Sequence, residues 1–295
     1  EQMNRLFLIF VTLLCCASCD LVYGKRNMDI KNVDWKALEF TCKREKSLWP
    51  RVDEEADGWF KQARKLEKED KEGAEKYIIP LYEKAAERNH FKAINNLALM
   101  YRNGYGVPVN EKKAVELVER LIAMNIGAGY YQMGNFLEQG IGVEQDRVAA
   151  LAYYRKSADL GDPQGQFLIG KTLVDKFLQT PMRAQAIALG TKMLECSLSQ
   201  GHAPAGYELG MTYAIVEENI PKALAYFQQA AALGHEASLF SLIGIFRDGE
   251  YGITKDPQRS ACYQKLLDEV DAEKSKRFPN IDRICPLPPK PIPDA

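Results

Sequence analysis

The chain has 295 residues, of which 46% are hydrophobic and 27% are charged. This length and composition are sufficient for a folded chain with a sizeable core. Its 39 basic and 40 acidic side chains leave a formal net charge of −1, which disfavours nucleic acid as a partner because proteins that bind nucleic acid carry basic patches.

Residues 1–18 have the pattern of an export signal. One basic residue, Arg5, precedes the apolar run Leu6–Cys16, which is short for a membrane span. The small residues before Cys19 resemble the signal of a bacterial lipoprotein, which implies that Cys19 becomes a lipidated N-terminus. An ordinary cleaved secretory signal is the alternative. We therefore expect a periplasmic, membrane-anchored protein, and the following Asp20 resembles a signal for retention at the inner membrane.

Residues 19–55 are interpreted as the lipidated N-terminus and a cap that precedes a helical stack. The apolar rings of Trp49, and of Trp59 and Phe60 just after it, are expected to close the exposed end of that stack, because a terminal repeat has no neighbour to cover it.

A period of 36 residues marks residues 56–275 as a repeat region. Gly104–Val107 reads Gly-Tyr-Gly-Val, and Gly140–Val143 reads Gly-Ile-Gly-Val. Apolar residues around these loops recur at intervals of three and four, which indicates helices and not strands. The period therefore predicts about six helical hairpins. Asn and Gly favour the left-handed conformation that ends a helix. The second helices are predicted to end at Asn89, Asn125, Gly161, Gly201 and Gly234.

The repeat unit resembles the Sel-one-like repeat, a bacterial relative of the tetratricopeptide repeat. The resemblance is carried by the Leu209-Gly210 pair, the Gly-x-Gly-Val loops, the helix Ala223–Phe227 and the helix end Ala231–His235. It implies an all-α fold, a right-handed α/α superhelix or solenoid of helical hairpins with a concave inner face. The fourth and fifth units depart from the pattern because they lack the glycine loop.

The same analogy places certain positions of each first helix on the inner face, where a protein partner is expected to bind. Aromatic residues anchor many protein interfaces. The alternative is that Tyr131, Phe167 and Tyr207 only pack between neighbouring repeats. In the sixth unit, the same analogy also places Ser241 on the inner face. The expected partner-binding residues are Asn95, Leu99, Arg102, Tyr131, Asn135, Glu138, Phe167, Lys171, Tyr207, Met211 and Ile245.

The three histidines argue against an enzyme. His90, His202 and His235 each follow the residue that ends a repeat, so they occupy one position in three units and cannot converge on one substrate or metal ion. They are interpreted as surface turn residues. No nucleophile, base and orienting group can be assembled from the sequence, and we predict no catalytic residue, no cofactor and no metal site.

Four cysteines remain after Cys19, and an oxidising compartment permits disulfides among them. Three pairings are possible for Cys42, Cys196, Cys262 and Cys285. A bridge between Cys262 and Cys285 would need the C-terminal tail to fold back, and a buried apolar thiol at Cys262 is the alternative. Without a Cys-x-x-Cys pair, redox and zinc chemistry have little support.

Residues 276–295 form a proline-rich C-terminal tail. Prolines at 279, 286, 288, 289, 291 and 293 predict an extended segment that runs along the stack without helix. Recognition of this tail as a proline-rich ligand is a further alternative.

Segments on both sides of the repeats sharpen the resemblance. Phe40–Cys42, Leu48–Pro50, Glu55–Leu66 and Ile281–Pro289 resemble a subgroup of exported Sel-one-like proteins that serve as immunity proteins for type VI secretion phospholipase effectors. This implies a secreted phospholipase effector as the partner, which the chain sequesters in the periplasm without chemistry of its own. Membrane contact would be through the lipid anchor only. The alternative is a periplasmic scaffold or regulatory adaptor for envelope assembly or stress signalling.

Overall fold

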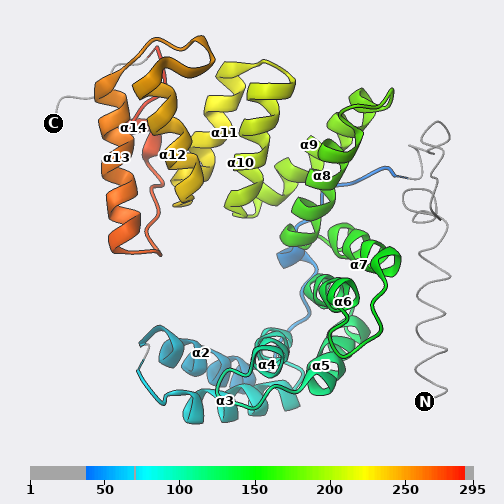
Figure 1. Ribbon diagram of the computed structural model, residues 1–295. Helices are drawn as coiled ribbons and strands as arrows, with labels where there is room; N and C mark the ends of the chain where they lie inside the picture. The colour runs from blue at the N-terminus through cyan, green and yellow to red at the C-terminus, as the bar shows by residue number, and fades with distance from the viewer. Residues whose placement is uncertain (1–37, 70, 290–295) are drawn as a thin grey trace. The chain divides into compact units, whose positions relative to one another are not determined.

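The computed structural model describes residues 38–69 and 71–289 (Figure 1). The expected export signal and the lipidation site Cys19 lie outside the described residues. The chain divides into two compact units, Glu1–Gln166 and Phe167–Ala295. All regular elements in the described part are helices, so the predicted all-α hairpin fold is confirmed.

The first unit contains three helical hairpins. Each hairpin pairs a first helix with a second helix that packs along it. Side-chain caps start several of these helices: the Asn110 side chain accepts a hydrogen bond from the backbone N–H of Lys113 at 2.9 Å, which satisfies a donor that the helix leaves unpaired. The helices are α2 (Glu54–Glu69), α3 (Glu75–Glu87), α4 (Phe91–Asn103), α5 (Glu111–Ala123), α6 (Gly127–Gln139) and α7 (Arg147–Asp159).

The second unit contains the remaining hairpins and a short terminal helix, and the boundary between the two units falls inside α8. After α10 and α12 the chain continues in π-helical turns, Thr212–Val216 and Ile245–Gly249. A 3-10 turn, Glu250–Gly252, follows the second of them. The helices are α8 (Pro163–Phe177), α9 (Arg183–Ser199), α10 (Ala203–Met211), α11 (Ile220–Ala232), α12 (Glu236–Gly244), α13 (Pro257–Ala272) and α14 (Ile281–Ile284).

The ends of the second helices lie where the sequence predicted them. All five marker residues have a left-handed backbone, with φ between 57° at Asn89 and 91° at Gly201. This conformation closes the helix and turns the chain toward the next hairpin. The regular spacing of Asn and Gly therefore reflects the geometry of the hairpin connection.

Residues 38–50, which we call the N-terminal strap, lie across the connections of the first unit and include a 3-10 turn, Glu45–Ser47. The Arg155 guanidinium donates to the Glu39 carbonyl oxygen at 2.8 Å. The Gln166 side-chain amide donates to the Lys43 carbonyl oxygen at 3.0 Å. The Trp49 ring lies 5.2 Å from that of Phe91 at the start of α4. Trp49 therefore packs against the start of the second hairpin.

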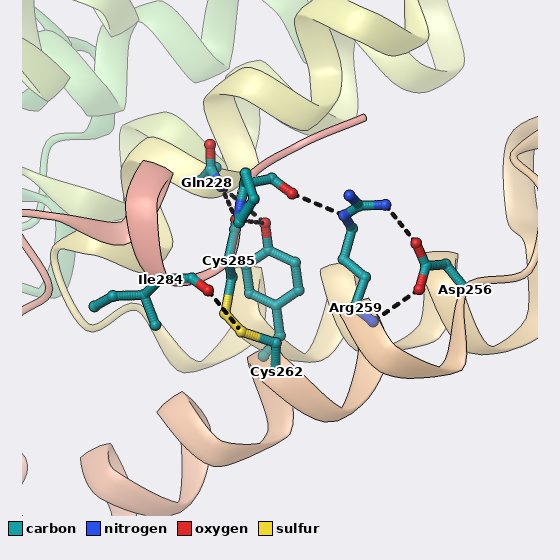
Figure 2. The surroundings of a disulfide bond; sticks show 8 residues. Gln228, Asp256, Arg259, Cys262, Ile284 and Cys285 are labelled. Atoms are coloured by element: carbon teal, nitrogen blue, oxygen red, sulfur yellow. Dashed lines mark hydrogen bonds and ion pairs between the residues drawn. A yellow bond between two sulfur atoms is a disulfide. The ribbon is translucent and has the colours of Figure 1, made fainter. Parts of the chain in front are cut away.

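The C-terminal residues 278–287, which we call the closing segment, fold back onto α11 and α13 (Figure 2). Cys262 and Cys285 form the disulfide that the sequence left open. The buried Gln228 amide donates to the Cys285 carbonyl oxygen at 2.6 Å and to the Tyr263 hydroxyl at 2.8 Å. The Arg259 side chain donates to the Pro286 carbonyl oxygen at 2.7 Å. Cys42 and Cys196 are disulfide-bonded as well.

The prediction of a tail without helix is wrong for α14, which lies between Pro279 and Pro286. Proline interrupts a helix mainly through its own missing N–H and through its ring, so the stretch between two prolines is free to form one turn. The backbone N–H of Cys285 donates to the Ile281 carbonyl oxygen at 2.8 Å. This turn carries the buried side chains of Ile281 and Cys285 to the core of the second unit.

Candidate protein-binding surface

The first helices of the hairpins carry one position that recurs on the same face. It is the fifth residue of the helix. The position is half-buried in α4, α6, α8 and α10 and exposed in α12. It is occupied by Asn95, Tyr131, Phe167, Tyr207 and Phe240.

In the first unit, the predicted residues of α6 surround one tyrosine hydroxyl. The Tyr154 hydroxyl lies 2.9 Å from Asn135 Oδ1 and 2.8 Å from Glu138 Oε2, and the Tyr131 ring lies 5.6 Å from the Tyr154 ring. Burial raises the pKa of Tyr131, and burial followed by the Glu138 contact raises the pKa of Tyr154. Both phenols therefore stay neutral, and the α6 face presents a fixed set of polar groups.

The predicted residues of α4 continue this face at the side of α6. Arg102 donates a hydrogen bond to Gln139 at 3.1 Å, and its guanidinium carbon lies 5.9 Å from the centre of the Phe136 ring. Asn95 and Leu99 are half-buried. The predicted residues of α4 and α6 thus share one surface of the first unit, with a cation, a carboxylate and polar amides on it.

In the second unit, Lys171 of α8 is paired with two carboxylates. Its amine lies 2.8 Å from Glu208 of α10 and 3.3 Å from Asp175. The Phe167 ring lies 4.9 Å from the His202 ring. The Met211 side chain packs on the core of the unit and is half-buried. This face is therefore built of partly covered aromatic and ion-paired residues.

The rings of Tyr131, Phe167 and Tyr207 all make the contacts that the packing alternative describes. Tyr207 lies 5.8 Å from Phe227 and 5.5 Å from His235. None of the three rings is fully buried, so each retains an accessible edge. Tyr131 belongs to the first unit, whereas Phe167 and Tyr207 belong to the second.

The prediction for Ile245 is wrong. Its side chain is 1% exposed and lies in the core of the second unit, so it offers no surface to a partner. The sequence analysis aligned Gly244 with Gly210, and this alignment shifts every predicted position of the sixth unit by one residue. Counting from the residue before the helix instead gives Phe240 in the place of Ser241.

Phe240 is therefore a surface residue that the sequence analysis missed. It is 59% exposed. The signal that locates it is the count of five from His235, which matches the count from His202 to Tyr207. The glycine pairs are a poorer marker, because Gly210 lies eight residues after His202 whereas Gly244 lies nine after His235, so the two glycines are not equivalent.

The interpretation of the histidines as surface turn residues is also wrong. His90 is 2% exposed, and its ring stacks 4.5 Å from that of Phe60. His202 and His235 are partly buried against Phe167 and Tyr207. Burial lowers the pKa of all three, and that of His202 falls to about 4. Each histidine thus packs as a neutral ring on an aromatic residue of the preceding hairpin.

The described residues contain no group of three or more His, Cys, Asp or Glu side chains arranged to hold a metal ion. Within the same residues, no helix has both the length and the apolar character needed to cross a bilayer. The faces of the first helices offer hydrogen-bond donors, acceptors and aromatic edges at fixed positions, which suits recognition of another protein.

Comparison with known proteins agrees with the hairpin geometry. The Sel1 repeat family matches residues 81–90, 91–125, 127–162 and 203–235. The immunity protein Pa5087 of Pseudomonas aeruginosa is 35% identical to the chain and superimposes with a TM-score of 0.69, over 86% of this chain and 96% of that protein. The chain belongs to the Sel1 repeat proteins.

Two further comparisons place this Sel1 repeat protein among its relatives. The immunity protein PA5088 of Pseudomonas aeruginosa is 32% identical, with a TM-score of 0.71, over 85% of this chain and 95% of that protein. The mouse protein DAP3-binding cell death enhancer 1 is 27% identical over 170 residues. The chain spans about a third of that mouse protein, at 32% of its length.

Proposed function

We propose that this Sel1 repeat protein is a non-catalytic immunity protein that sequesters a phospholipase-type effector of type VI secretion in the periplasm. The observation that carries the proposal is the similarity to Pa5087, which extends over 96% of that immunity protein at 35% identity. The phospholipase class rests on the resemblance of the segments that flank the repeats.

Sequestration requires only a surface that is complementary to the effector. The first-helix faces supply such surfaces, with Arg102, Glu138 and Tyr131 in the first unit and Lys171 and Tyr207 in the second. Because these side chains are held by hydrogen bonds, ion pairs or ring contacts, little side-chain freedom is lost on binding. The effector is blocked when its catalytic cleft or its approach to the membrane is covered.

The proposed test is co-expression with a candidate phospholipase effector that is directed to the periplasm. Cells that produce both proteins are expected to survive, and the two proteins are expected to co-purify. A chain that neither protects cells nor forms a measurable complex would sink the immunity function. A chain that does not protect cells but binds an envelope regulator would favour the scaffold alternative.

One pair of variants distinguishes the proposed face from the rest of the surface. Leu99→Asp places a charge on the half-buried position of α4 and is expected to weaken the complex. Val148→Asp is the control, because Val148 is 47% exposed at the start of the second helix α7. Equal affinities for the two variants would place the interface elsewhere.

We further propose that Cys19 carries the lipid that holds the protein at the membrane. Cys19→Ser removes the thiol that is lipidated, so the protein is expected to move from the membrane fraction to the soluble periplasmic fraction. Unchanged fractionation of this variant would refute the lipid anchor and leave the binding function untouched.

A further inference from the structure

Phe240 of α12 is an aromatic side chain without a cover. It is 59% exposed, although it occupies the position at which Tyr131, Phe167 and Tyr207 are half-buried. No other ring among residues 38–69 and 71–289 stacks on it. An exposed phenyl ring at the face already assigned to partner binding calls for an explanation.

The preceding hairpins show what normally covers such a ring. In two places, a histidine just before a first helix packs on the aromatic ring at this position in the hairpin before it: His202 lies 4.9 Å from Phe167, and His235 lies 5.5 Å from Tyr207. His90 packs in a similar way 4.5 Å from Phe60, which lies two positions further along α2. The repeat thus has a built-in stacking site on each of these first helices, and the next hairpin fills it.

In the described residues, α13 is followed by the closing segment and not by a further hairpin that could cover Phe240. After α13 the chain turns back toward α11, where the backbone N–H of Phe278 donates to the Ala232 carbonyl oxygen at 2.7 Å. The closing segment then packs on the core of the second unit. The stacking site on α12 is therefore left open by the way in which the repeat ends.

Two carboxylates lie near the face of α12 that carries Phe240, one from Glu236 of α12 and one from Glu250 of the turn that follows. Glu236 lies one helical turn before it, and Lys274 pairs with Glu236 at 3.0 Å. Gly244 lies one turn after it, and a Cβ atom at Gly244 would come 3.4 Å from Glu250 Oε1. Glu250 makes no direct ion pair in the described part of the chain, although Arg247 lies near enough for the two charges to interact. A ring with a carboxylate beside it favours a planar cation over a neutral ring.

We propose that the effector docks on the second unit at Phe240, and that it supplies an arginine side chain where the preceding hairpins place a histidine. The guanidinium would stack on the phenyl ring and face the Glu250 carboxylate. This inference rests on the proposed immunity function and specifies the partner's chemistry at one point of the interface.

Three variants of Phe240 and one control variant separate stacking from simple apolar contact. The affinity for the candidate phospholipase effector would be measured by isothermal titration calorimetry. Phe240→Ala is expected to weaken binding about tenfold or more, as for a central aromatic anchor. Phe240→Leu keeps apolar area without a π face and should also weaken it, whereas Phe240→Trp should preserve it. Tyr77→Ala is the matched control, because Tyr77 is also 59% exposed, on α3.

The contribution of the Glu250 charge is tested with a separate variant. Glu250→Gln is expected to weaken binding several-fold and to reduce its dependence on salt, because one attraction between opposite charges is lost. Thermal unfolding of every variant should match that of the native chain, since Phe240 contributes little to the core.

Four results would overturn the proposal. Native affinity of Phe240→Ala would show that the effector binds elsewhere, with the immunity function intact. Equal affinities of Phe240→Leu and the native chain would show that no cation stacks on the ring. If Phe240→Ala instead abolished a dimer seen by analytical ultracentrifugation, a second copy of this chain would be the occupant. A native chain that forms no complex with the phospholipase would overturn both this inference and the proposed function.

Discussion

At the scale of single residues, Asp162 combines two roles that conflict. Its carboxylate accepts a hydrogen bond from the backbone N–H of Gly165 at 2.8 Å and so caps the start of α8. The side chain is 1% exposed. Burial, reinforced by the nearby Glu45 carboxylate, raises the pKa of Asp162 to about 7. Asp162 stabilises the start of α8 as a cap, but its buried position disfavours its charged form.

This conflict predicts a pH dependence of stability. Between about pH 4 and pH 7 the folded chain keeps a proton on Asp162 that the unfolded chain has already released, so stability falls as the pH rises. Asp162→Asn keeps the cap, since Asn and Asp are comparable at this position, and removes the titration. Urea unfolding of both proteins should show the variant gaining stability relative to the native chain as the pH rises. Parallel curves would contradict the raised pKa.

His202 predicts a pH dependence of stability with the opposite sign. Its pKa is lowered from 6.5 to about 4, first by burial and then by His235. Below about pH 6.5, His202 therefore binds a proton in the unfolded chain but not in the folded chain, so stability falls as the pH drops. In an NMR titration, the ring resonances of His202 should stay at their neutral positions down to about pH 5. A midpoint near 6.5 would show that the ring is solvated and not packed on Phe167.

At the scale of the helices, the glycines of the first helices have two different roles that a sequence cannot distinguish. A Cβ atom at Gly134 would lie 2.5 Å from the Tyr154 ring, whereas a Cβ atom at Gly58 of α2 would meet nothing within 4 Å. Glycine lowers helix stability relative to alanine by about 1 kcal/mol. Only the glycine at a close helix contact offsets that loss.

Two alanine substitutions should therefore act in opposite directions. Gly134→Ala is expected to destabilise the protein by about 1–3 kcal/mol, because the methyl group forces Tyr154 out of place. Gly58→Ala is expected to stabilise it by about 0.5–1 kcal/mol, because the unfolded chain loses freedom and the folded helix gains no clash. Chemical denaturation measures both. A stabilising effect at Gly134 would mean that the helices of that hairpin separate easily.

Much of the hairpin architecture could be predicted from sequence because its determinants are local. Left-handed residues at Asn89 and Gly201 end helices through their own backbone. The positions on the sixth unit could not be predicted in the same way. Gly210 lies eight residues after His202, whereas Gly244 lies nine after His235, so an alignment on Gly244 moves Ile245 to the surface and hides Phe240. Local packing of the histidines was also not visible, because it depends on the neighbouring hairpin.

At the scale of the whole molecule, a stack of repeats must end in something other than another repeat. In the second unit, the closing segment serves this purpose. Phe278, Ile281 and Cys285 bury their side chains against the residues that a further hairpin would otherwise cover. The sequence suggested the bridge from Cys262 to Cys285 as one of several pairings, but the buried Gln228 that holds the Cys285 carbonyl oxygen could be found only in the structure.

The closing segment gives a final prediction about stability. The disulfide joins residues separated by 23 positions, and a loop of this size stabilises a protein by about 3 kcal/mol through the entropy of the unfolded chain. The double variant Cys262→Ala, Cys285→Ala is expected to lose about this amount in chemical denaturation. Gln228→Ala should cost about 1–3 kcal/mol by leaving the buried Cys285 carbonyl oxygen with fewer donors. If both variants unfold like the native chain, the closing segment does not cover the core, and the end of the stack must be stabilised by other contacts.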